Sequence, residues 1–549
     1  MTKLLLLGDE AIAQAAIDAG LSGMYAYPGT PSTEIMEYVQ SSKGAAERNI
    51  QREWSSNEKT AMEAALGMSY AGKLSMVAMK HVGLNVAADP FINAAITGVN
   101  GGMIVVSADD PSMHSSQNEQ DSRFYAHFAF IPCFEPSNQQ EAYDMVFDAF
   151  ELSEKYRVPV MIRITTRLAH SRASVNLVDR PAPEKKLKIP ADPVQFVLLP
   201  ALARKKYRTL LKTYGSIRYD ARISKYNFFK DGKKRDLGII ASGIAYNYLM
   251  ENIAGLDNIY PVLKISAYPF PGDTIEDISS RCRELLVIEE GYPLIEEGLR
   301  GILDKGKKIL GRMDGTLPRD GELNPTLVAK TLGMKVNYGH KVPDLVKLRP
   351  PSFCKGCGHA DMFNALIEAV KQYGPGRVFS DIGCYTLGAL PPYNAINSCV
   401  DMGASVTMAV GAADAGLFPS VAVIGDSTFT HSGMTGLLDA VVKNSPVTII
   451  ISDNSTTGMT GGQKSQATGR LEQICLGIGV DPEHLKVIVP LRKNHTENIH
   501  IIKEELVFRG VSVIIAFREC IQTATRKKKA KSKIRNRAEG ELGEANPKL

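Results

Sequence analysis

The stretch VAVIGDS, residues 421–427, is an apolar strand whose end carries an acidic side chain. A second apolar strand, VTIIIS at 447–452, ends in Asp453-Asn454, and Asn454 lies 29 positions after Gly425. Continuous apolar strands are typical of a parallel sheet that is covered on both faces. The carboxyl ends of such strands meet at one edge, which is where these sheets bind ligands. The sequence therefore predicts an α/β fold with a polar site at this edge.

Oxygen ligands gather at these two strand ends. Asp426 and the side-chain oxygen of Asn454 can bind one small hard cation, and the backbone carbonyl of Thr456 is the third protein ligand. Mg²⁺ prefers oxygen ligands and takes the rest from water and a substrate diphosphate. The next loop, GMTGGQ at 458–463, is rich in glycine, so its backbone can approach a bound phosphate. The alternative is two ordinary strand-end turns with capping Asp and Asn side chains.

The rest of the chain shows the same alternation of apolar runs and helical stretches. LSMVAMK (74–80), GGMIVVSADD (101–110) and VPVMIRITT (158–166) predict a second parallel sheet. A smaller α/β pattern lies between the two large ones. We predict domains at 1–190 and 346–522, a smaller domain with a linker at 236–345, a connecting segment at 191–235, and a basic disordered tail at 523–549.

Length and composition exclude several classes of protein. A chain of 549 residues is too long to fold around one hydrophobic core. Its 44% hydrophobic and 22% charged residues are typical of a globular enzyme. No apolar run approaches the ~20 residues that span a bilayer, and residues 1–20 are predicted to form a strand, a turn and a helix rather than a signal peptide. We expect a cytoplasmic protein without membrane attachment.

The net charge of +5 is concentrated at the C-terminus. From Arg526 onward there are nine Lys or Arg and three Glu, so the remaining chain has a net charge of −1. A nucleic-acid-binding surface is therefore not expected outside the tail. Eight cysteines in so long a chain do not indicate a disulfide scaffold, and the pair Cys354 and Cys357 is more typical of a metal or redox site.

The strand-end motif resembles the thiamine diphosphate signature, which begins Gly-Asp-Gly and ends in Asn-Asn or a variant about thirty residues later. Four further segments extend the resemblance, and they are YPGTPS (27–32), NEKTAMEAALGMSYAG (57–72), HSSQNEQDSR (114–123) and DIGCYT (381–386). Together they resemble the large subunit of the indolepyruvate type within the 2-oxoacid:ferredoxin oxidoreductases, over about residues 1–520. The resemblance implies two thiamine-diphosphate-type parallel-sheet domains flanking a smaller transketolase C-terminal-like domain.

The resemblance also implies roles for individual residues. Glu58 would promote the imino tautomer of the aminopyrimidine ring, Thr30 would contact the substrate, and Arg123 would bind the 2-oxoacid carboxylate. The implied cofactor-binding residues are Gly425, Asp426, Ser427, Asn454, Thr456, Gly458 and Gly461. Of these, Asp426, Asn454 and Thr456 would hold Mg²⁺. From the residues alone, Glu58 could be a solvated helix residue, Thr30 or Ser32 a helix N-cap, and Arg123 part of a surface salt bridge. Lys80, His81 and Asn85 are also expected to face the cofactor.

Four cysteines occupy positions that match the ligands of a [4Fe-4S] cluster in pyruvate-type relatives, and they are Cys354, Cys357, Cys384 and Cys520. Zinc or free thiols are the alternatives. The remaining four are interpreted as small buried side chains, and they are Cys133, Cys282, Cys399 and Cys475. Lys355 departs from the family, which usually has proline at this position.

The implied reaction is oxidative decarboxylation of a 2-oxoacid, here an aryl pyruvate such as indolepyruvate, with coenzyme A accepting the acyl group. The usual ferredoxin-like domain does not follow Cys520, so electrons are expected to pass from the cluster to an external carrier such as ferredoxin. A small beta subunit would complete the enzyme, with two copies of each chain. A non-redox decarboxylase that forms an aldehyde and a non-catalytic scaffold remain as alternatives.

Overall fold

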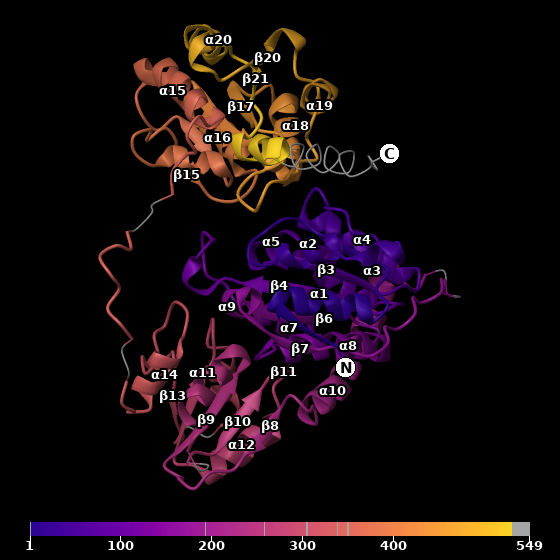
Figure 1. Cartoon of the computed structure of the whole chain (residues 1–549). Coiled ribbons are helices and arrows are strands. Elements are labelled where there is room, and N and C mark those ends of the chain that lie inside the picture. The colour runs from indigo at the N-terminus through magenta and orange to yellow at the C-terminus, as the bar shows by residue number, and fades with distance from the viewer. Residues whose placement is uncertain are drawn as a thin grey trace, which may run out of the picture. The chain divides into compact units, whose positions relative to one another are not determined.

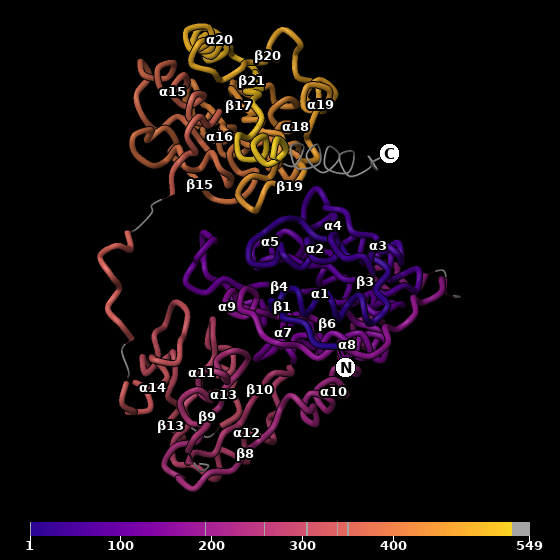
Figure 2. The backbone as a smooth tube through the Cα atoms, in the orientation of Figure 1, coloured from indigo at the N-terminus to yellow at the C-terminus, as the bar shows by residue number. Residues whose placement is uncertain are grey.

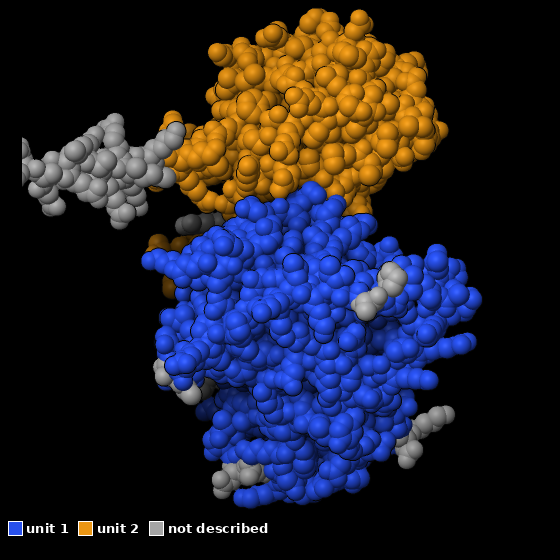
Figure 3. All heavy atoms as spheres, turned by 90° about the vertical axis from the view of Figure 1, so that its right-hand side faces the viewer, with its two compact units in different colours: residues 1–341 blue, residues 342–549 orange. Residues whose placement is uncertain are grey.

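The structure is a computed structural model that describes residues 2–190, 192, 194–256, 259–303, 306–336, 339–347 and 351–529. The chain divides into two compact units, residues 1–341 and residues 342–549 (Figure 3). Among the described residues, no helix has both the length and the apolar character needed to cross a membrane.

The N-terminal part of the first unit contains a sheet of six described strands in the order β11-β5-β6-β4-β3-β2 (Figure 1). These strands are β2 (Gly23–Ala26), β3 (Ser75–Lys80), β4 (Met103–Asp109), β5 (Cys133–Phe134), β6 (Val160–Thr165) and β11 (Ala267–Tyr268). Neighbouring strands run parallel, except that β11 is antiparallel to β5. The parallel sheet predicted from the apolar runs is confirmed.

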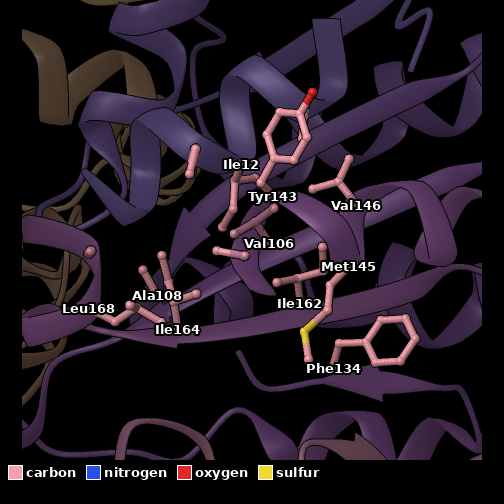
Figure 4. Close-up of a cluster of buried hydrophobic side chains, with 14 of the residues drawn as sticks. Ile12, Val106, Ala108, Phe134, Tyr143, Met145, Val146, Ile162, Ile164 and Leu168 are labelled. Atoms are coloured by element: carbon pink, nitrogen blue, oxygen red, sulfur yellow. The ribbon is translucent and has the colours of Figure 1, made fainter. Parts of the chain in front are cut away.

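Helices cover this sheet. They are α1 (Gly8–Asp18), α2 (Thr33–Ser41), α3 (Lys43–Glu47), α4 (Glu58–Tyr70), α5 (His81–Val86), α6 (Ala88–Thr97), η1 (Pro111–Met113), α7 (Arg123–Ala129), α8 (Gln139–Tyr156), α9 (Thr166–His170) and α10 (Pro200–Arg222). Separately, β1 (Lys3–Leu7) pairs antiparallel with β7 (Arg172–Asn176). Figure 4 shows the core that results, where Ile12 and Tyr143 from helices meet Val106 and Ile162 from the sheet, all four almost fully buried.

The middle part of the first unit contains a second sheet of five described strands in the order β13-β12-β9-β10-β8. Its elements are β8 (Phe228–Lys230), β9 (Leu237–Ser242), α11 (Gly243–Ile253), β10 (Val262–Ile265), α12 (Gly272–Arg281), β12 (Glu284–Ile288), α13 (Leu294–Ile302), β13 (Lys308–Leu310) and α14 (Pro325–Thr331). Strand β11 leaves this part to pair with β5, so the middle part completes the first sheet. The predicted connecting segment, 191–235, includes the 23-residue helix α10 and strand β8.

The second unit contains a parallel sheet of six described strands in the order β15-β14-β16-β17-β21-β20 (Figure 2). Its strands are β14 (Val378–Ser380), β15 (Ser398–Cys399), β16 (Ser420–Gly425), β17 (Val447–Asp453), β20 (Leu485–Ile488) and β21 (Val511–Phe517), with a small hairpin of β18 (Thr456–Thr457) and β19 (Gln463–Lys464). Its helices are α15 (Gly358–Val370), η2 (Lys371–Tyr373), η3 (Cys384–Ala389), α16 (Ala404–Asp414), α17 (Asp426–Thr428), the π-helical turn η4 (Phe429–Gly433), α18 (Met434–Lys443), α19 (Leu471–Ile478), η5 (Pro482–His484), η6 (Arg492–Asn494) and α20 (His495–Val507).

The order of these strands places the predicted site. β16 and β17 are central neighbours, and Gly425 pairs in register with Ser452, so their carboxyl ends lie side by side. β21 adjoins β17 with Phe517 opposite Asp453, which brings the chain after β21 to the same edge. Residues 521–529 are helical, and the rest of the predicted tail, 530–549, lies outside the described residues.

Candidate functional site

Asp426 lies at the carboxyl end of β16 and is 2% exposed. Among the described residues, nothing donates a hydrogen bond to its Oδ2 atom. Burial, followed by the negative charge of Asp453, raises the pKa of Asp426 to about 7, although a hydrogen bond from Ser465 opposes the rise. A buried acceptor without a donor is costly. A divalent cation would remove that cost, so the donor set at this strand end fits Mg²⁺.

Hydrogen bonds fix the neighbouring segment. The Asn454 Oδ1 atom accepts the backbone N–H of Thr456 at 3.1 Å, and the Thr456 hydroxyl donates to the Gln463 carbonyl at 2.8 Å across the β18–β19 hairpin. Ser427, at the start of the helix after β16, lies with its hydroxyl 2.8 Å from that of Thr457. The two strand ends predicted to act together are therefore linked by side chains as well as by the sheet.

The glycine-rich loop after β18 is constrained at two positions. A Cβ atom at Gly458 would lie 2.9 Å from the Cys384 sulfur, closer than side chains pack. Gly461 has a φ of 123°, in the region that favours glycine, and its carbonyl accepts a hydrogen bond from Arg526. Glycine is needed here for close approach, which is also the property that a phosphate-binding loop requires.

The four predicted cluster cysteines line one cavity of about 70 Å³, together with Asp453 and Asn454. Burial raises the pKa of Cys384 to about 12, and the other three thiols of the cavity contribute to the rise. The four cysteines come from separate segments of the chain, around Cys354 and Cys357, at Cys384 and at Cys520. The structure places the four cysteines around one cavity, and their role as cluster ligands stays a prediction.

Backbone hydrogen bonds hold the cysteine segments. The N–H of Cys357, at the start of α15, donates to the Cys354 carbonyl at 3.0 Å, and the N–H of Cys520 donates to the Asn454 carbonyl at 3.0 Å. The second contact joins the thiol cavity directly to the predicted cation-binding strand end. Of the other cysteines, three are buried as predicted, whereas Cys399 is only half-buried.

Glu58 is the first residue of α4 and is 5% exposed, so it is not a solvated helix residue. A Cβ atom at Gly83 would lie 2.5 Å from the Glu58 Oε1 atom, so glycine is needed where α5 passes this carboxylate. Lys80, at the end of β3, is also buried. Burial lowers its pKa to about 8, although the negative charges of Asp110 and Glu58 act to raise it. The carboxylate therefore lies in a protected site beside a buried amine whose pKa is lowered.

The loop after β2 carries Thr30, which is half-buried. Ser115 joins this loop to the Lys80 side chain, because its hydroxyl donates to the Thr30 carbonyl at 3.1 Å and its own carbonyl accepts the Lys80 amine at 3.0 Å. The N-cap of α2 is Ser32, whose side chain makes no capping hydrogen bond, so capping does not explain Thr30. Of the other residues expected at the cofactor, His81 is buried and Asn85 accepts a hydrogen bond from Tyr125.

Arg123 is 1% exposed, so the alternative of a surface salt bridge is wrong. Its guanidinium contacts the carboxylates of Asp121 at 2.5 Å, Glu289 at 3.1 Å and Glu135 at 3.5 Å. It also donates to the Tyr292 carbonyl at 2.8 Å, so it joins the N-terminal and middle parts of the first unit. The predicted role in binding a substrate carboxylate stays a prediction, because this guanidinium already has carboxylate partners.

Sequence reasoning missed the rest of this buried network. Arg163, in β6, is fully buried against Asp109 at 2.7 Å. Glu289 and Glu290 follow β12 and are each 1% exposed. The available signal was a charged residue inside or directly after an apolar run, as in VMIRIT and LLVIEE.

Comparisons with known proteins agree with this arrangement. Residues 14–209 match the family described as pyruvate flavodoxin/ferredoxin oxidoreductase, thiamine diphosphate binding, and residues 381–483 match the thiamine pyrophosphate enzyme C-terminal binding domain. The fold and the site thus define a thiamine-diphosphate-dependent enzyme.

The chain is 39% identical to the indolepyruvate oxidoreductase subunit IorA of Archaeoglobus fulgidus, over 97% of this chain and 89% of that protein. It is 39% identical to the same subunit of Methanothermobacter marburgensis over 94% and 87%, and 38% identical to that of Pyrococcus abyssi over 94% and 86%. The chain belongs to the 2-oxoacid:ferredoxin oxidoreductase family. A solved 2-oxoglutarate:ferredoxin oxidoreductase from Magnetococcus marinus, 17% identical, superposes with a TM-score of 0.48 over 60% of this chain and 65% of that one.

Proposed function

We propose that this chain catalyses the oxidative decarboxylation of an aryl pyruvate such as indolepyruvate, with thiamine diphosphate and Mg²⁺, and that electrons leave through one [4Fe-4S] cluster to an external carrier such as ferredoxin. Carbon dioxide, two electrons and the thiol proton of coenzyme A are released, and the coenzyme A sulfur accepts the acyl group. The observation that carries the proposal is the cavity shared by Asn454 and the four thiols. It would place an electron acceptor beside the residues that anchor the cofactor.

The second unit would supply the diphosphate anchor. Asp426 would bind Mg²⁺ through its unpartnered Oδ2 atom, and the Asn454 side chain and the Thr456 carbonyl would complete the protein ligands. Gly458 and Gly461 would let the backbone approach the diphosphate, with Gly425 and Ser427 at the start of the helix. When bound, thiamine diphosphate supplies a nucleophilic carbon and an electron sink for decarboxylation.

The first unit would supply the acid–base group. Glu58 would hold and release a proton at the aminopyrimidine ring, and its burial would keep bulk water from that proton. Thr30 would offer a hydroxyl to the substrate, and Ser115 fixes the position of its loop. Arg123 would act on the substrate only by exchanging one of its carboxylate partners, so its present geometry favours a positioning role.

The choice of an iron–sulfur cluster over zinc rests on the family resemblance. Cysteine thiolates are the usual ligands of such a cluster, and four cysteines line this cavity. The high pKa of Cys384 also means that a metal is needed to keep this thiol deprotonated.

A partner subunit is part of the proposal. The relatives are named as one subunit, IorA, of indolepyruvate oxidoreductase. We propose that this chain assembles with a small beta subunit into a heterotetramer and that the assembled enzyme passes electrons to ferredoxin or a similar carrier.

The test is iron and acid-labile sulfide analysis of the anaerobically purified protein, with electron paramagnetic resonance before and after addition of indolepyruvate, coenzyme A and thiamine diphosphate. We expect about four irons per chain and a signal that appears with substrate. Cys384→Ser should lose the iron, whereas Cys399→Ser, a half-buried cysteine outside the cavity, should keep it. Absence of iron with aldehyde as the product would replace this proposal by a non-redox decarboxylase.

A further inference from the structure

Three side chains that have no part in the proposed reaction converge from separate helices of the first unit. Asp9 comes from the start of α1, Glu34 from α2 and His170 from the end of α9. One ligand atom from each lies within 4.8 Å of the other two. The His170 Nε2 and Glu34 Oε2 atoms are 3.5 Å apart.

Asp9 is the unusual member of this group. Its side chain is fully buried, and among the described residues neither carboxylate oxygen has a hydrogen-bond partner or a cation. The Glu34 Oε2 atom is also buried, and the His170 ring is its ion-pair partner at 3.5 Å. Burial and the charges of Glu34 and Glu10 raise the pKa of Asp9 well above its usual value. A buried carboxylate beside other acids is costly unless a cation or a proton neutralises it.

We propose that Asp9, Glu34 and His170 form a binding site for a divalent transition-metal cation of the zinc type, with water completing the coordination. Zinc binds imidazole nitrogen and carboxylate oxygen at about 2.0–2.2 Å, which sets neighbouring ligand atoms about 3.3–3.5 Å apart. The observed separation of 3.5 Å between Glu34 and His170 agrees. The imidazole favours zinc over Mg²⁺, and two carboxylates balance the charge of one divalent ion.

The position of the group gives the cation both access and a role. His170 is exposed and Glu34 half-buried, so an ion can enter from solvent and reach the buried carboxylate. The start of α1 is pressed against α9, because a Cβ at Gly8 would lie 2.3 Å from the Leu168 carbonyl oxygen. A cation here would tie α1, α9 and α2 together, and α2 follows directly after the loop that carries Thr30. The site would be structural, and it does not depend on the proposed reaction.

The test measures zinc on the full chain purified with its partner, after chelator treatment and dialysis against buffered free zinc. The wild type should retain about one more zinc per chain than Asp9→Asn or His170→Gln, and each variant should bind that ion about tenfold or more weakly. Glu10→Gln is the matched control, since Glu10 lies beside Asp9 on α1 but accepts the Leu7 N–H at 2.8 Å. Zinc taken up by cysteines is common to all four proteins. Equal zinc content in all four would overturn the proposal.

Thermal unfolding separates a cation site from a carboxyl that is merely protonated. With chelator present, Asp9→Asn should raise Tm by roughly 2 °C or more, because it removes a buried, unpartnered carboxylate. Added zinc should raise Tm for the wild type and not for Asp9→Asn, as expected for a ligand bound by the native state. His170→Gln, an exposed change, should keep the wild-type Tm in chelator and lose the zinc response. A wild type whose Tm ignores zinc would contradict the proposal.

Discussion

Glu289 and Glu290 are adjacent acids that should respond differently to replacement by glutamine. Both are 1% exposed, and burial raises the pKa of each from 4.5 to about 7. Their partners differ. Glu290 accepts the Thr165 hydroxyl and the Leu323 N–H, each at 3.0 Å, whereas Glu289 accepts two backbone N–H groups, one on each oxygen.

The raised pKa values fix the sign of the pH dependence. The folded state holds these protons to higher pH than the unfolded state does. Below about pH 4.5 each acid is neutral in both states, so no stability is lost there. Stability is lost as the pH rises from 4.5 to about 7, and the loss is complete above that. A rise of that size corresponds to about 3 kcal/mol for each group at pH 8.

Glu290→Gln should therefore stabilise the protein at pH 8. The amide oxygen can accept the Leu323 N–H and the amide nitrogen can donate to the Thr165 hydroxyl, so both hydrogen bonds survive without the charge. We expect a gain approaching about 3 kcal/mol at pH 8 and less than about 1 kcal/mol at pH 5. Glu289→Gln also removes a buried charge at pH 8, but it must turn an NH₂ group against a backbone N–H at both pH values, which costs about 1–3 kcal/mol. We therefore expect Glu289→Gln to destabilise the protein at pH 5 and to gain less stability than Glu290→Gln at pH 8.

Denaturant unfolding followed by tryptophan fluorescence suits this comparison. The sequence contains one tryptophan, Trp54, and it packs against the core of the first unit, which also contains both glutamates. The signal therefore reports the unit that carries the mutation. If Glu290→Gln lowered stability at pH 8, or changed it equally at pH 5 and pH 8, the reasoning from burial would be refuted.

Three further predictions concern close approach and buried charge. Gly83→Ala should push the carboxylate at the start of α4 out of position and lower kcat about 10²-fold, measured by steady-state kinetics, whereas Gly67→Ala on α4, with open space at its Cβ, should not. Gly458→Ala should lower the iron content, measured chemically, because its Cβ would lie 2.9 Å from the Cys384 sulfur. Gly477→Ala, with open space at its Cβ, is the control, and equal iron in the two variants would count against the cluster site. Arg123→Lys should lower the unfolding free energy by about 3–5 kcal/mol in the same fluorescence assay, because a lysine cannot contact all three carboxylates. A change in KM with unchanged stability would instead support binding of the substrate carboxylate.

The parts of the fold that could be predicted from sequence are those set by local pattern. The apolar runs that became β16 and β17 have the length and composition of buried strands, and the direction of a parallel sheet then places Asp426 and Asn454 at one edge. The four cysteines could be brought together only through the family resemblance, because Cys354 and Cys520 are far apart in the chain and no spacing rule joins them.

The parts that could not be predicted depend on long-range pairing. Arg123 looked like a free guanidinium for a substrate because its partner Glu289 lies more than 160 positions later. Asp9 lies at the start of a helical stretch, where an acid is favourable near the helix dipole, and its sequence neighbours do not indicate that it is fully buried. Burial and pairing of charged side chains are properties of the assembled core, so a sequence window does not contain them.

Strand β11 has a consequence for how the chain is made. It pairs with β5 at one edge of the first sheet, yet Ala267 and Tyr268 are synthesised about 100 residues after β6 is complete. At a translation rate of about 5–20 residues per second, that edge stays open on the ribosome for roughly 5–20 s. An open strand edge pairs readily with other chains. The nascent first unit should therefore be most prone to aggregation, and most dependent on chaperones, in this interval, and a pause in translation before Ala267 should lower the yield of folded protein.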